Sequence, residues 1–86
     1  MDNVIEVWEH GELKNFCGPE CYDAPLSRCN CMCGGANHNA GQEQAELNAA
    51  ISGEEWLHIE ILNARLDPAH VTCQILGVEA MIPLLV

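Results

Sequence analysis

The chain has 86 residues, which predicts one domain near the size at which a hydrophobic core alone gives little net stability. Thirteen acidic residues stand against three Lys or Arg, so the formal net charge is −10. Proteins that bind DNA or RNA neutralise phosphates with Lys and Arg, and this composition therefore argues against direct nucleic-acid binding.

The N-terminal part predicts a β-hairpin over residues 3–16. Residues 4–8 are rich in β-branched and aromatic side chains, and His10-Gly11 supplies a turn before residues 13–16. The first residues are acidic and lack the basic and apolar regions of a signal peptide. We therefore expect a cytoplasmic protein, in which thiols stay reduced and clustered cysteines bind metal rather than form disulfides.

Six candidate metal ligands follow in a segment, residues 17–38, that has no hydrophobic period. They are five cysteines and one histidine: Cys17, Cys21, Cys29, Cys31, Cys33 and His38. Thiolate and imidazole groups at this density are typical of Zn²⁺ sites, and Gly34-Gly35 favours a tight turn behind the last cysteine. We expect one zinc ion bound by Cys17 and Cys21 with two of the other four. A second zinc with a bridging thiolate, an iron–sulfur cluster and disulfides are the alternatives left open.

Two short stretches resemble known sequences. Phe16-Cys17-Gly18-Pro19-Glu20-Cys21-Tyr22 resembles the F-C-S-x-x-C half-site of TRASH-like and MYM-type treble-clef zinc fingers, with glycine in place of serine and without their upstream C-x-x-C pair. That resemblance implies zinc ligation by the two cysteines. The run C-x-C-x-C-G-G-x-N-H at residues 29–38 resembles small uncharacterised proteins of phages and mobile elements, and it implies no particular activity.

A central helix is predicted over residues 40–52. Asn39 is a favourable N-cap, Glu43 and Glu46 suit the early turns, and Gly53 lies just past the expected end.

Beyond Gly53 the pattern changes to an alternation of apolar and polar residues at 57–61 and again at 71–75, with a turn signal at residues 67–70. This predicts a C-terminal hairpin over about residues 56–85, with a third strand over residues 78–85. A helix over residues 54–66 is the competing interpretation, because Ile59, Leu62 and Leu66 share one helical face.

The remaining thiol and imidazoles are not assigned to metal. Cys73 lies in the second alternating segment, where a buried apolar thiol is expected. His10, His58 and His70 are isolated from one another in the sequence.

Together these elements predict a small α+β domain stapled by zinc, with an N-terminal hairpin, a cysteine-rich loop, one central helix and C-terminal antiparallel strands. The stretch 71–86 is apolar but too short and too interrupted for a membrane span. No catalytic motif accompanies the cysteines, and a thiolate-rich set indicates a closed structural site, so we expect no enzyme.

The expected function is an acidic protein-interaction module whose partner has a basic surface. The mobile-element resemblance extends this to a phage-encoded inhibitor that occupies a nucleic-acid-binding surface of a host protein. One alternative is a structural subunit or homodimer assembled through the apolar C-terminal strand at residues 80–86. The other is a thiol-based metal or redox sensor.

Overall fold

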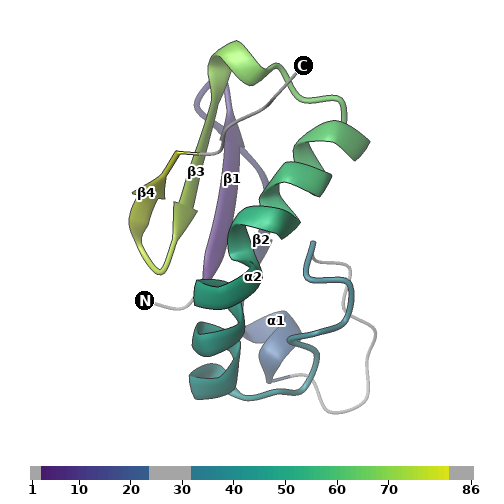
Figure 1. Ribbon diagram of the computed structural model, residues 1–86, viewed down its shortest axis with the longest axis vertical. Helices are drawn as coiled ribbons and strands as arrows, with labels where there is room; N and C mark the ends of the chain where they lie inside the picture. Colours follow the sequence, from purple (N-terminus) through teal and green to yellow (C-terminus); the bar gives the residue numbers. More distant parts are fainter. Residues whose placement is uncertain (1–2, 24–31, 82–86) are drawn as a thin grey trace.

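The computed structural model describes residues 3–23 and 32–81. They form a small α+β fold in which a four-stranded antiparallel sheet, ordered β2-β1-β3-β4, packs against one long helix (Figure 1). The elements in chain order are β1 (Ile5–Glu9), β2 (Glu12–Cys17), α1 (Pro19–Tyr22), α2 (Gln42–Asn63), the 3-10 turn η1 (Pro68–His70), β3 (Val71–Ile75) and β4 (Val78–Ala80).

The predicted N-terminal hairpin is confirmed. His10 and Gly11 join β1 to β2 with φ values of 52° and 78°, the left-handed conformation that suits the twist of a two-residue hairpin turn. Ile5 pairs with Cys17 at the far end of the hairpin, so the end of the sheet fixes the position of this cysteine.

The central helix is longer than predicted, because it continues through Gly53 to Asn63. The strand predicted at residues 57–61 is therefore wrong, and the competing helical interpretation is correct for this segment. Asn39 is not the N-cap; Gly41 occupies that position without a side-chain hydrogen bond. The helix ends in a Schellman motif, in which Leu66 N donates to Ile61 O at 3.0 Å around a left-handed Arg65.

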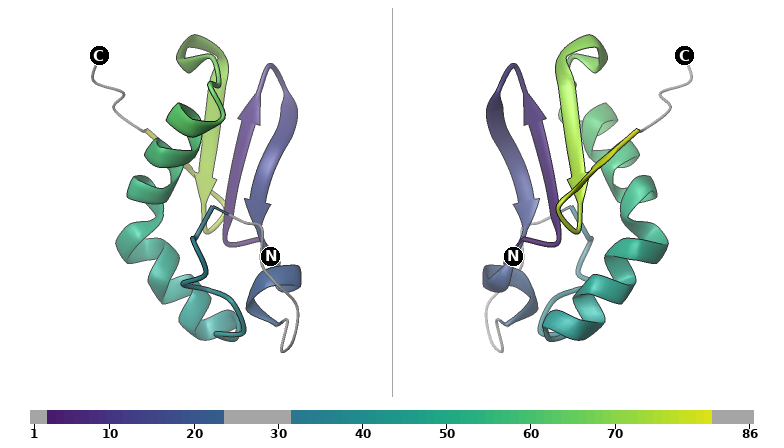
Figure 2. Two further views of the ribbon diagram at one scale, coloured as in Figure 1. Left: turned by 90° about the vertical axis from the view of Figure 1, so that its right-hand side faces the viewer. Right: turned by 90° about the vertical axis from the view of Figure 1, so that its left-hand side faces the viewer.

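Every fourth residue of α2 is buried, and this explains why residues 57–61 show the apolar–polar alternation that is typical of a strand. The buried row is Ala45, Ala49, Gly53, Leu57 and Ile61. Leu57 and Ile61 are two members of the strand-like pattern that lie one helical turn apart, whereas Ile59 between them is exposed. Figure 2 shows α2 along one face of the sheet, where this row packs with buried Ile5 and Val7.

Gly53 lies inside the helix because it faces the sheet at close range. A Cβ at this position would lie 3.1 Å from Ile75 Cδ1 and 3.4 Å from Ile5 Cδ1. Glycine inside a helix costs about 1 kcal/mol relative to alanine, and here that cost permits the close approach of helix and sheet.

We expect Gly53→Leu to lower the free energy of unfolding by roughly 1–3 kcal/mol, because the added atoms overpack this contact. Gly53→Ala should lie within about 1 kcal/mol of the natural protein, since helix propensity offsets the tight contact. Urea unfolding measures both changes. Ala50→Leu, on the exposed side of α2, is the matched control, and an equal loss in that variant would contradict the prediction.

The predicted C-terminal strands at residues 71–75 and from 78 onward are present and antiparallel, but they form the hairpin with each other, whereas the hairpin was predicted between residues 57–61 and 71–75. Leu76 and Gly77 make the turn between β3 and β4 with φ values of 53° and 79°. The other edge of β3 pairs with β1, in the place where residues 57–61 had been predicted. Residues 82–86, the end of the predicted third strand, lie outside the described residues. Over the described parts of the chain, none of the helices combines the length and the apolar character of a membrane span.

Cys73 is buried on β3 opposite Val7, as expected for an apolar thiol. Burial raises the pKa of the Cys73 thiol from 9.0 to about 11, because the low-dielectric interior disfavours the thiolate.

This shift predicts a loss of stability in alkali. Below pH 9 the thiol is protonated in both states; above it the unfolded chain loses this proton first, so stability falls as the pH rises toward 11. The difference in unfolding free energy between the natural protein and Cys73→Ala should change by about 2 kcal/mol between pH 8 and pH 11. Urea titrations at each pH test this, and parallel pH curves for the two proteins would contradict it.

Candidate metal centre

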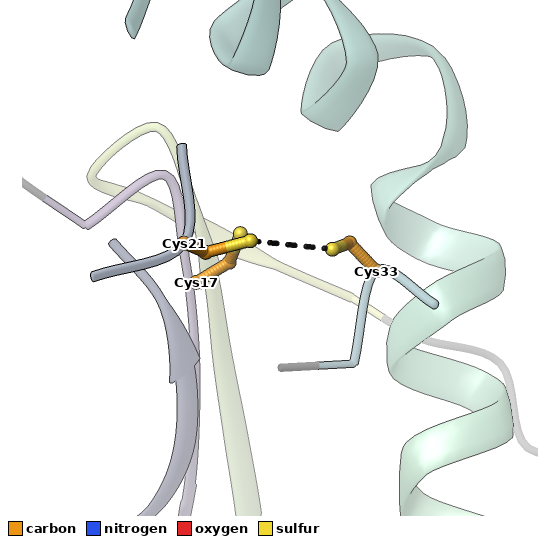
Figure 3. Close-up of side chains that lie close together, drawn as sticks. All are labelled: Cys17, Cys21 and Cys33. Atoms are coloured by element: carbon orange, nitrogen blue, oxygen red, sulfur yellow. Dashed lines mark hydrogen bonds between the residues drawn. The ribbon is translucent and has the colours of Figure 1, made fainter. Parts of the chain in front are cut away.

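Three of the predicted ligands meet at the end of the sheet nearest the start of α2. Cys17 is the last residue of β2, Cys21 lies in α1 one turn later, and Cys33 comes from the turns that precede α2. All three are buried, and their Sγ atoms lie within 4.8 Å of one another. Figure 3 shows Cys33 facing Cys17 and Cys21 across the gap between the two segments.

The sulfur separations suit a tetrahedral ion. Cys21 Sγ and Cys33 Sγ are 3.6 Å apart. Zinc–sulfur bonds of about 2.3 Å place neighbouring thiolates about 3.8 Å apart in a tetrahedral site, which is close to this separation. Three close, buried cysteines can therefore hold a metal ion.

The first two cysteines are brought together by α1 and the glycine before it. Gly18 O accepts from Cys21 N at 2.8 Å, and Pro19 occupies the first turn, where its missing N–H costs nothing. A Cβ on Gly18 would collide with the side chain of Asn3. A larger residue at position 18 would therefore require the Asn3 side chain to move.

The segment that carries Cys33 is tied to α1 by backbone hydrogen bonds. Asn39 N donates to Cys21 O at 2.9 Å, and Gly41 N donates to Tyr22 O at 2.8 Å. The predicted tight turn is present, since Gly34 and Gly35 have φ values of 65° and 95°. This turn reverses the chain directly behind Cys33 and returns it toward α1.

Of the other three predicted ligands, the structure describes only His38. His38 does not join the group of three, because its ring nitrogens are not within 4.8 Å of all three sulfurs. Its Nδ1 is nevertheless buried and has no hydrogen-bond partner among the described residues. An unpaired buried nitrogen costs about 1–3 kcal/mol, a penalty that a bound ion would remove. Cys29 and Cys31 lie outside the described residues.

A buried amide supports the sulfur of Cys17. Asn37 is fully buried, and its Nδ2 donates to Cys17 Sγ at 3.4 Å. Its Oδ1 accepts from Asn48 Nδ2 of α2 at 2.9 Å, and Asn48 Oδ1 in turn accepts from Gln44 Nε2 at 2.9 Å. An N–H···S bond stabilises a thiolate relative to a thiol, and such outer contacts orient metal ligands. Sequence reasoning assigned no role to Asn37, although it lies inside the cysteine-rich run.

The sulfurs also have redox chemistry available. Cys21 is disulfide-bonded in this structure. The same sulfur cannot be a disulfide and a thiolate ligand at once. The metal-binding and disulfide interpretations of this cluster are therefore two states separated by oxidation.

A second group of metal-binding residue types was missed. His10, Asp67 and His70 offer ligand atoms within 4.8 Å of one another at the opposite end of the β1–β2 hairpin. His10 is far in sequence from Asp67 and His70, and the pairing of β1 with β3 brings it to them.

Comparison of the chain with protein-family models, with curated protein sequences and with solved structures found no match. The two local resemblances at residues 16–22 and 29–38 therefore stay predictions that rest on their motifs alone.

Proposed function

We propose that the protein is a zinc-stabilised interaction module that presents the outer face of α2 to a protein with a basic and apolar surface. Zinc is proposed because three buried cysteine sulfurs lie within 4.8 Å of one another, and the buried Nδ1 of His38 in the same segment is a candidate for the fourth ligand. In this proposal the ion is structural, since buried sulfurs leave no open position for a substrate.

The observation that carries the proposal is the composition of α2. The helix contains five glutamates and no Lys or Arg. Its outer side exposes four large apolar residues: Leu47 (53%), Ile51 (82%), Ile59 (48%) and Leu62 (61%). Leu47, Ile51, Glu55 and Ile59 follow one another at intervals of four, so apolar and acidic side chains share the face opposite the sheet.

The chemistry of this face defines its partner. Single exposed apolar residues are ordinary, but several exposed leucines and isoleucines along one helix are typical of a binding surface. The adjacent glutamates would repel an acidic surface and attract a basic one, which speeds encounter and selects the partner. The resemblance to mobile-element proteins extends the proposal to an inhibitor that occupies a nucleic-acid-binding surface of a host protein.

Site-specific photo-crosslinking from position 51 identifies the partner, and titration with that purified partner then tests the proposal. Replacing Glu43, Glu54 and Glu55 with Gln should weaken binding at least tenfold at low salt and flatten its salt dependence. Ile51→Ala should weaken binding without changing the salt dependence.

The matched control replaces Glu12, Glu20 and Glu79 with Gln, which changes net charge equally at exposed positions outside α2. It should change affinity less than threefold. Equal effects from both triple variants, no effect from either, or no crosslinked partner would overturn the proposal. Competition between the partner's nucleic acid and this protein tests the inhibitor extension separately.

A second candidate function, a thiol-based redox sensor, is favoured by the close approach of buried sulfurs: Cys21 is disulfide-bonded, and its Sγ lies 3.6 Å from Cys33 Sγ. Peroxide would convert ligand thiolates to a disulfide and release zinc, and a reductant with zinc would reverse this. Reversible zinc release at micromolar peroxide supports the sensor. Metal that stays bound under peroxide would exclude it.

A further inference from the structure

We propose a second metal site, formed by His10, Asp67 and His70, that binds one Zn²⁺ ion with an open coordination position. His10 lies in the β1–β2 turn and Asp67 and His70 lie at η1; both histidines are exposed, Asp67 is half-buried, and their ligand atoms lie within 4.8 Å of one another. Two imidazoles and one carboxylate are ligands that zinc binds at about 2.0–2.2 Å.

The side-chain distances are already close to those of a bound ion. Asp67 Oδ2 lies 2.7 Å from His70 Nδ1 and 3.9 Å from His10 Nε2. Ligand atoms around a tetrahedral zinc are about 3.3 Å apart at these bond lengths, so side-chain rotations bring all three to one ion. The ion would replace the hydrogen now shared between Asp67 and His70.

The backbone holds the three residues in place before any ion arrives. His10 N donates to His70 O at 3.0 Å, which ties the β1–β2 turn to η1. Asp67 N donates to Glu9 Oε2 at 2.6 Å, and Asp67 Oδ1 caps Ala69 N at 3.0 Å. Asp67 can therefore use Oδ2 as a ligand while its other oxygen keeps the cap.

The two rings are stacked, with centroids 4.4 Å apart and an interplanar angle of 25°. Because an imidazole nitrogen binds an ion in the plane of its ring, the two rings must turn out of this stack when they share one ion. Three protein ligands leave a fourth position for water or for a side chain of a partner.

The test is isothermal titration calorimetry of the reduced full-length chain with Zn²⁺. We expect a zinc equivalent in addition to the cysteine site, with affinity reduced at least tenfold by His10→Ala, by His70→Ala and by Asp67→Asn. His58→Ala is the matched control, because His58 lies on α2 outside this group, and it should leave the affinity unchanged.

Long-range ¹H–¹⁵N spectra of the histidine rings provide a second readout. Zinc should shift the ring nitrogens of His10 and His70 and leave those of His58 in place. Circular dichroism checks that the variants keep their helix. Absence of the additional equivalent, or equal affinity in the double variant His10→Ala/His70→Ala, would overturn this site without affecting the cysteine cluster.

Discussion

Removal of metal from the reduced protein should unfold it. An excess of a strong zinc chelator is expected to abolish most of the helical circular dichroism of α2, and added Zn²⁺ should restore it. Zinc binding contributes roughly 10–16 kcal/mol to folding in small zinc domains, which exceeds the net stability of many domains of this size. Cys17→Ser and Cys33→Ser should each reproduce the effect, because a hydroxyl is a poor zinc ligand.

We expect metal removal to unfold the protein because the end of the molecule that carries Cys17, Cys21 and Cys33 has little other apolar packing. The described core there consists of the three cysteines, Tyr22 and the small residues Ala45 and Ala49 of α2. The segment carrying Cys33 consists of consecutive turns, which supply few internal hydrogen bonds and little apolar surface. Without an ion or a cross-link, the start of α2 keeps the hydrogen bonds from Asn39 and Gly41 to α1 but loses its strongest link to β2 and α1.

Two controls separate metal from disulfide in this experiment. Cys73→Ala should leave chelator sensitivity unchanged, since this thiol lies on β3 and is not part of the cluster. Treatment with a phosphine reductant alone should leave a zinc-bound protein folded. Unfolding by the reductant together with resistance to the chelator would contradict the metal prediction and establish a disulfide as the staple.

The cysteine cluster was partly predictable because its ligands are close in sequence. The C-x₃-C pair needs only one short helix to bring Cys17 and Cys21 together. The two glycines that follow Cys33 predict a reversal of the chain there. The contribution of Asn37 depends on the orientation of one amide, and no residue pattern encodes that orientation.

The long helix was not predictable in the same way, because its apolar residues lie on two faces. The buried residues from Ala45 to Ile61 recur at every fourth position, which is typical of a helix. Exposed Ile51 and Ile59 lie between them, so apolar residues occur at every second position, as in a strand. A glycine in this position of a pattern usually indicates a helix end, whereas Gly53 lies inside the helix because it leaves room for the side chain of Ile75. The grouping of His10 with His70 depends on strand pairing across most of the chain, which local patterns do not contain.

Asn37→Leu should weaken zinc binding by about 10–100-fold, the usual consequence of losing an outer contact to a metal ligand. Leucine matches the size of the buried amide but cannot donate to Cys17 Sγ, and it leaves the facing amide of Asn48 without its acceptor. A lost hydrogen bond to a charged group also costs about 1.5–3 kcal/mol of stability. Competition against a chromophoric chelator measures the affinity.

A spectroscopic readout distinguishes this role from simple packing. In the Co²⁺-substituted protein, the sulfur-to-cobalt charge-transfer band should move to longer wavelength in Asn37→Leu, because a thiolate without its N–H donor holds its electrons less tightly. Asn63→Leu, an exposed change at the end of α2, is the matched control and should leave the band in place. Weaker binding with an unmoved band would mean that Asn37 acts through packing. A shifted band together with weaker binding would mean that Asn37 acts by stabilising the negative charge of the Cys17 thiolate. In that case the hydrogen bond between Asn37 and Asn48 connects α2 to the metal centre.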